Sequence, residues 1–241
     1  MEYCLLKTIR KRGLDVKEKC LKEIFRRHIT DAGVDRLTFE LDSKNQKIVI
    51  HNDKSRAGGY KAHYGDVAVY GSDGKVKTTL TFTLVGESVE IPLKEMEDED
   101  LDATQILPNY SNYGYFYYEL NDSQREYFNH YNEKLDKKAL AVLNQYEFLR
   151  TVYGDNTVKD YLDLACRIIK NHPKLINVVC GKVYIQGLMA LSPPEVQSYI
   201  KSRVTRSLLK ISIKNKNDIS YLEFILLYAD NDENIRKMYE F

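Results

Sequence analysis

The spacing of apolar residues changes near residue 94 and divides the chain into two halves. Between residues 36 and 93, apolar and polar residues alternate in short runs separated by polar or glycine-rich breaks, which is typical of β-strands. After residue 119, apolar residues recur at every third or fourth position, which is typical of amphipathic helices. The pattern therefore predicts an α+β fold.

Five strands are predicted in the first half, over residues 36–41, 47–50, 66–70, 75–84 and 89–93. The sequence Gly71-Ser72-Asp73-Gly74 indicates a hairpin turn, because Asp-Gly supplies the positive φ of a tight turn. Gly86 begins a second predicted turn. An antiparallel β-meander of about five strands follows from this order. It is preceded by one N-terminal helix over residues 14–30, where apolar residues recur every fourth position.

The second half is predicted to be mostly helical. A capping box of Ser123 and Glu126 opens its first helix. Gly154 ends a later helix, and an Asn-His-Pro sequence at 171–173 ends the next. Ser192 is the predicted N-cap of a helix that starts with proline, and a last helix begins near Asp218. Residues 174–191 are apolar but fit no single element.

Three segments are expected: a domain over 1–94, a junction over 95–118 and a helical domain over 119–241. The junction starts with an acidic run, Glu95–Asp102, which fits a solvated linker better than a calcium loop because it has no glycine. Seven of the 19 tyrosines then lie between Tyr110 and Tyr131.

The tyrosines are a candidate protein interface. In an extended segment, Tyr113, Tyr115 and Tyr117 point to one side, and Phe116 and Tyr118 point to the other. One side is expected in the core, and core packing alone is the favoured explanation of these rings, ahead of an interface and of a platform for a ligand. Tyrosine is enriched in protein–protein interfaces because it offers a large contact area at low entropic cost, so the other side is a candidate partner surface.

A second candidate surface is basic. Arg203, Arg206, Lys210 and Lys214 fall close together around a helix, in a segment over 201–217 that has no acidic residue. Such a face can follow the phosphates of a nucleic acid, which tyrosines can support by stacking on bases. The net charge of +1 argues against a dedicated polyanion binder. A solvated helix face, or one that pairs with the acids of a neighbouring subunit, explains these residues better.

The signatures of catalysis are missing from the sequence. It has no Gly-x-Ser-x-Gly motif and no phosphate-binding loop, and its five histidines lack metal-ligand spacing. Asp66, Glu87 and Glu90 loosely resemble the metal-binding carboxylates of nucleases, but surface charge pairs explain them better. The four cysteines form no metal or disulfide pattern and are expected to be buried free thiols in a reducing compartment. No metal, cofactor or small-molecule substrate is expected.

These features favour a non-catalytic structural or assembly protein that acts through protein–protein contacts, in a homo-oligomer or a larger particle. The composition suits a virus or phage component and equally suits a low-GC bacterium. The alternatives are a nucleic-acid-binding protein that uses the 201–217 face and, less favoured, a metal-dependent nuclease or other hydrolase. No apolar run approaches the ~20 residues of a membrane span, so a cytoplasmic protein, or one assembled inside a cell, is expected.

Overall fold

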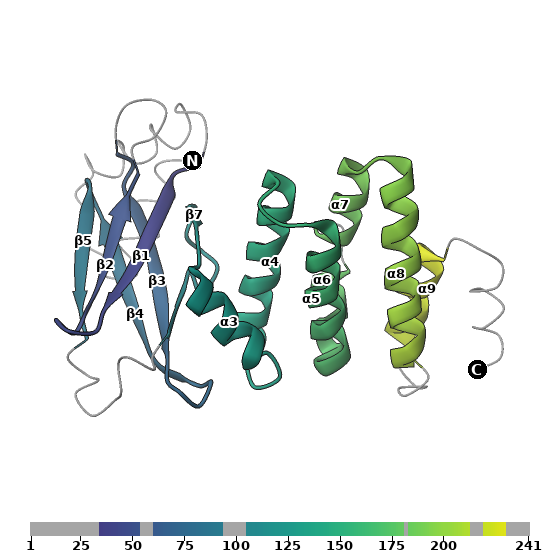
Figure 1. The fold of residues 1–241 in the computed structure, drawn as a ribbon, viewed down its shortest axis with the longest axis horizontal. Helices are drawn as coiled ribbons and strands as arrows, with labels where there is room; N and C mark the ends of the chain where they lie inside the picture. Colours follow the sequence, from purple (N-terminus) through teal and green to yellow (C-terminus); the bar gives the residue numbers. More distant parts are fainter. Residues whose placement is uncertain (1–33, 54–59, 94–104, 181–182, 213–218, 230–241) are drawn as a thin grey trace, which may run out of the picture. The chain divides into compact units, whose positions relative to one another are not determined.

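The computed structural model describes residues 34–53, 60–93, 105–180, 183–212 and 219–229 (Figure 1). The chain divides into two compact units: residues 1–127, called here the strand unit, and residues 128–241, called the helical unit. The broad α+β prediction is confirmed. The predicted helix over 14–30 lies outside the described residues, and the predicted division into domains stays a prediction.

The described part of the strand unit contains two sheets, with the strand orders β5-β2-β1-β7 and β4-β3-β6. The strands are β1 (Arg36–Asp42), β2 (Lys47–Asn52), β3 (His63–Tyr70), β4 (Val76–Leu84), β5 (Ser88–Pro92), β6 (Gln105–Pro108) and β7 (Tyr117–Tyr118).

The five predicted strands are present as β1 to β5 and the hairpin turn before Gly74 is confirmed, but the single meander is wrong. The β1–β2 and β3–β4 pairs are antiparallel neighbours, and Gly74 has the expected positive φ of 80°. However, β5 pairs with β2 and not with β4, so the chain changes sheets at Gly86. Alternation identifies strands and tight turns, but it carries no information about which distant strands share a ladder.

Aromatic rings from both sheets form the core of the strand unit. Phe39 on β1 meets Phe82 on β4 edge to face, with ring centroids 5.8 Å apart. The Phe116 ring centroid lies 5.9 Å from each of them, and Tyr118 packs on Phe39. Burial of such rings is a strong source of stability, so these contacts hold the two sheets together.

Helix α3 (Asp122–His130) begins earlier than the predicted capping box requires. Its capping box consists of Asn121 and Gln124: each backbone N–H donates to the other side chain at 2.8 Å. The prediction of Ser123 and Glu126 is therefore wrong by two positions. Asparagine and glutamine perform the same reciprocal bonding as serine and glutamate, which explains the error.

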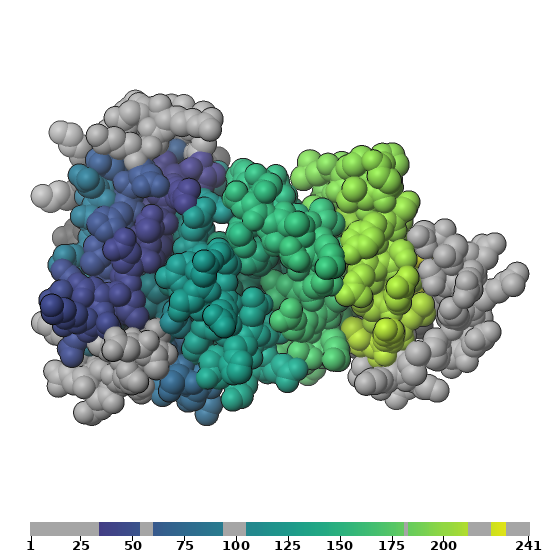
Figure 2. Space-filling model, in the orientation of Figure 1, coloured from purple at the N-terminus to yellow at the C-terminus, as the bar shows by residue number. Residues whose placement is uncertain are grey.

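The helical unit packs its helices around buried apolar and tyrosine side chains. Figure 2 shows one outer face of these helices, coloured from teal to yellow along the sequence. Gly154 ends the first long helix in the left-handed region, as predicted. The ambiguous segment 174–191 forms short pieces. The elements are α4 (Lys137–Tyr153), α5 (Val158–Asn171), η2 (Pro173–Leu175), α6 (Ile176–Val179), α7 (Ile185–Leu191), α8 (Pro194–Ser212) and α9 (Ile219–Tyr228).

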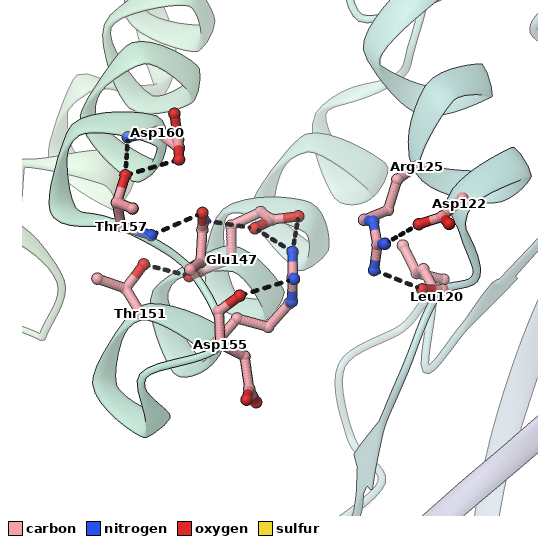
Figure 3. A network of polar contacts seen from close by, with 10 residues as sticks. Leu120, Asp122, Arg125, Glu147, Thr151, Asp155, Thr157 and Asp160 are labelled. Carbon is pink, nitrogen blue, oxygen red and sulfur yellow. Dashed lines mark hydrogen bonds and ion pairs between the residues drawn. The ribbon is translucent and has the colours of Figure 1, made fainter.

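The connection between α4 and α5 is fixed by polar contacts (Figure 3). The Arg150 guanidinium donates to the Asp155 carbonyl at 2.9 Å. Thr157 is the N-cap of α5, and its hydroxyl accepts from the Asp160 backbone N–H at 3.1 Å. The short loop therefore sets the direction of α5 relative to α4.

The predicted N-cap of α8 is also displaced. The Val196 and Gln197 N–H groups donate to the Pro193 carbonyl, and the Ser192 hydroxyl donates back to Leu188 at the end of α7. The helix therefore begins one residue later than predicted. The Ser192 side chain bonds the preceding helix, so it does not cap α8.

Candidate protein-interaction site

The tyrosine loop, residues 109–115, lies between β6 and β7 of the strand unit. Asn109 starts the loop in the left-handed region, with φ at 55°. Its side chain closes the loop by donating to the Gly114 carbonyl at 3.0 Å and accepting from the Gly114 N–H at 2.8 Å. Asparagine tolerates this backbone conformation better than most residues, and its amide is both donor and acceptor, so one side chain fixes both ends of the loop.

Asp66 on β3 anchors the loop from beneath. The residue is 1% exposed, and its two carboxylate oxygens accept from the Ser111 N–H at 3.1 and 3.2 Å. The Asp66 backbone carbonyl also accepts from the Asn109 N–H at 2.7 Å. Hydrogen bonds to a charged acceptor are stronger than neutral ones, so this carboxylate stabilises one loop conformation.

Two glycines leave room for the ring under the loop. A Cβ atom at Gly114 would overlap Cε1 of Phe116, and one at Gly65 would lie 2.9 Å from the same atom. Phe116 is buried among core rings and has little freedom to move away. The loop is therefore built around Phe116.

Three phenol rings are exposed at this site. Tyr113 and Tyr64 of β3 are each 49% exposed and stack with ring centroids 5.7 Å apart, at an interplanar angle of 19°. Tyr115 is 64% exposed. Partial burial, with the nearby Asp66 charge and Tyr64, raises the pKa of Tyr113 to about 12. The Tyr113 hydroxyl therefore stays protonated and able to donate a hydrogen bond at physiological pH.

The structure brings two of the three predicted tyrosines to the surface. Tyr113 and Tyr115 are exposed, Tyr117 is half-buried, and Phe116 and Tyr118 are buried. Their role in an interface stays a prediction. The alternating pattern did not identify Tyr64, because its stack with Tyr113 joins distant positions of the chain.

A buried cluster of ionisable groups lies in the same unit, and no sequence pattern indicates it. Lys61 Nζ lies 3.5 Å from one Asp35 oxygen, and His63 Nε2 lies 3.1 Å from the other. The side chains are 2% exposed or less, and Phe116 packs on His63. A substrate needs access to the groups that act on it, and these groups are buried. The geometry therefore fits a structural link between β1 and β3.

The predicted basic residues lie apart from the tyrosine loop in sequence, on α8 of the helical unit. Arg203 Nη2 pairs with Asp163 on α5 at 2.6 Å, and this contact raises the pKa of Arg203. Arg206 and Lys210 are exposed. Lys214 lies outside the described residues.

The carboxylates that resemble a nuclease site are engaged separately. Asp66 accepts from the loop backbone, whereas Glu90 pairs with Lys47 at 2.6 Å in the other sheet. Within residues 34–229, apart from the segments not described, no three His, Cys, Asp or Glu side chains are placed to hold a metal ion. In the same described portion, no helix is long and apolar enough to cross a membrane.

Comparison with models of known protein families gives no match, and comparison with curated proteins gives none either. The site is therefore interpreted from its own geometry.

Proposed function

We propose that this protein is a non-catalytic structural or assembly component whose tyrosine loop contacts another protein chain, in a homo-oligomer or a larger particle. The observation that carries this proposal is the exposure of Tyr113 and Tyr115 on a loop with a fixed backbone, beside the exposed Tyr64 of β3. A loop that only faced solvent would need neither the buried carboxylate anchor nor the exposed aromatic stack found here.

Pre-organisation supports the proposal energetically. A partner that binds an ordered loop does not have to offset the conformational entropy that a flexible loop loses. The stacked rings of Tyr64 and Tyr113 also offer a rigid apolar surface with hydroxyl groups at its edge. Such a surface has the character of an interface hot spot.

The described cysteines support assembly in a reducing compartment. Cys166 and Cys180 are free and buried, as the sequence predicted for its cysteines. Burial raises the pKa of both thiols, which keeps them protonated and unreactive.

Sedimentation equilibrium of the purified chain, over a wide range of concentration, tests this proposal. We expect a concentration-dependent mass above the 28.1 kDa of one chain. Replacing Tyr113 and Tyr115 together with alanine should weaken association at least ~30-fold, which corresponds to about 2 kcal/mol. Tyr153→Ala is the matched control, because Tyr153 is 63% exposed but lies at the end of α4.

Two results would contradict the proposal. One is a strictly monomeric chain, both alone and in native extract. The other is an equal loss of association in the Tyr153→Ala control.

A further inference from the structure

Helices α5 and α8 of the helical unit pack side by side in the same direction. Asp163 of α5 pairs with Arg203 of α8, and one turn further along, the Ser207 side chain lies beside the Cys166 thiol. Both contacts advance by similar steps along the two helices, and Lys170 and Lys210 each lie about one further turn along their own helix.

Exposed cations lie on both sides of the contact between α5 and α8. Arg167 and Lys170 lie on the exposed side of α5, and Arg206 and Lys210 lie on the exposed side of α8. Two short rows of cations therefore lie on either side of the contact between α5 and α8. Together they are called here the α5–α8 ridge, which consists of Arg167, Lys170, Arg203, Arg206 and Lys210.

The ridge is poorly neutralised within the described residues. Asp163 pairs with Arg203, but no ion pair is formed by Arg167, Lys170, Arg206 or Lys210 with the part of the chain that the structure describes. Arg167 and Lys170 lie three positions apart on α5, and Arg206 and Lys210 lie four apart on α8, so each pair repels and an anionic ligand would relieve the repulsion.

An aromatic ring lies at one end of the ridge. Tyr199 is 42% exposed and precedes Arg203 by one turn of α8. It lies close enough to Arg203 to interact with its charge. An exposed ring beside cations is the arrangement with which proteins stack a base and hold the adjoining phosphates.

We propose that the α5–α8 ridge binds single-stranded nucleic acid, with phosphates along the cations Arg167, Lys170, Arg206 and Lys210 and a base on Tyr199. A single strand is favoured over a duplex because only an unstacked base offers its face to a tyrosine ring. This inference is independent of the proposed protein interface, which uses residues of the strand unit.

Fluorescence anisotropy with a labelled oligothymidylate tests the inference. Four phosphate contacts predict a fall in affinity of about 50-fold between about 50 and 200 mM salt. The double variant Arg206→Gln/Lys210→Gln should bind more weakly, and its logarithmic salt slope should be shallower by about 1.4. The matched control is Lys137→Gln/Lys174→Gln, which removes the same charge from exposed positions outside the ridge and should bind like wild type.

Two further variants separate stacking from charge. Tyr199→Ala should weaken binding about tenfold and leave the salt slope unchanged. Asp163→Asn should strengthen binding roughly two- to fivefold, because it removes a carboxylate and releases Arg203. All these side chains are at least partly exposed, and thermal unfolding of each variant checks that the fold is retained.

Absence of binding at about 50 mM salt would overturn the inference, and so would equal losses in the ridge and control variants. A peptide of residues 94–103, which contains the acidic run Glu95–Asp102, tests whether the ridge binds an acidic protein segment in place of nucleic acid. If the ridge binds this peptide and not the oligonucleotide, the ridge serves an acidic protein segment and the inference is wrong.

Discussion

The two units of this protein differ in the charges that they bury. In the strand unit, Asp35, Lys61 and Asp66 are buried, whereas Tyr64 and Tyr113 form an exposed stack. In the described part of the helical unit, the buried polar side chains are uncharged, and the cations Arg167, Arg206 and Lys210 are exposed.

The difference indicates where the structure accepts an unfavourable arrangement. The helical unit follows the ordinary preference for solvated charges. The strand unit buries charges, which costs free energy unless each is paired, and it also stacks two exposed rings, Tyr64 and Tyr113, at its surface. Groups that lower stability are often kept because they serve a function. Of the two units, the strand unit with its tyrosine loop is therefore the stronger candidate for a partner site.

Charge removal in the two units should have very different effects. Asp35→Asn would remove the buried carboxylate that Lys61 and His63 both contact, and we expect the free energy of unfolding to fall by about 3–5 kcal/mol. Asp163→Asn breaks a pair whose side chains are each 37% exposed, and should cost less than about 1 kcal/mol. Urea unfolding of both variants measures the difference.

Equal costs for Asp35→Asn and Asp163→Asn would remove the contrast. The buried cluster would then contribute no more than a surface pair, and the strand unit would not depend on its internal charges.

Glycine-to-alanine substitution should also separate the units. At Gly114 the new Cβ would meet the buried Phe116 ring, so we expect a loss of about 1–3 kcal/mol together with weaker self-association. At Gly154 no atom lies within 4 Å of the new Cβ, and the positive φ alone should cost about 1 kcal/mol. Sedimentation and urea unfolding of both variants test this; a Gly114→Ala chain that associates normally would show that loop geometry is unimportant.

The titration of Tyr113 tests the electrostatics of the loop. Its pKa is raised from 10.0 to about 12, so the folded state holds the proton more tightly than the unfolded state. The resulting stabilisation is complete below about pH 10 and is lost as the pH rises through about 12.

The difference in phenolate absorbance between wild type and Tyr113→Phe should therefore show one group that titrates near pH 12. A difference curve centred near pH 10 would contradict the placement of Tyr113 beside Asp66.

The parts of the fold that the sequence predicts correctly are local. The turn before Gly74 and the end of α4 at Gly154 each depend on neighbouring residues and on the conformational freedom of glycine. The pairing of β5 with β2 and the parallel pairing of β7 with β1 join distant segments, so no periodic pattern predicts them.

The candidate site has the same limit. Alternation along the chain correctly placed Phe116 and Tyr118 away from Tyr113 and Tyr115. The anchor of the loop could not be predicted, since Asp66 and Ser111 lie 45 positions apart and meet only when β3 pairs with β6. The sequence suggested a metal ligand at Asp66, because no sequence pattern indicates its hydrogen bond to a loop amide.

Site-specific photo-cross-linking from position 115 tests the central claim most directly. A photoreactive phenylalanine analogue replaces Tyr115 in one preparation and Tyr153 in another, two positions that are 64% and 63% exposed. We predict an adduct to a second polypeptide from position 115, suppressed by Gly114→Ala, and no adduct from position 153. Adducts from both positions in equal yield, or from neither, would contradict the assignment of the tyrosine loop as a protein interface.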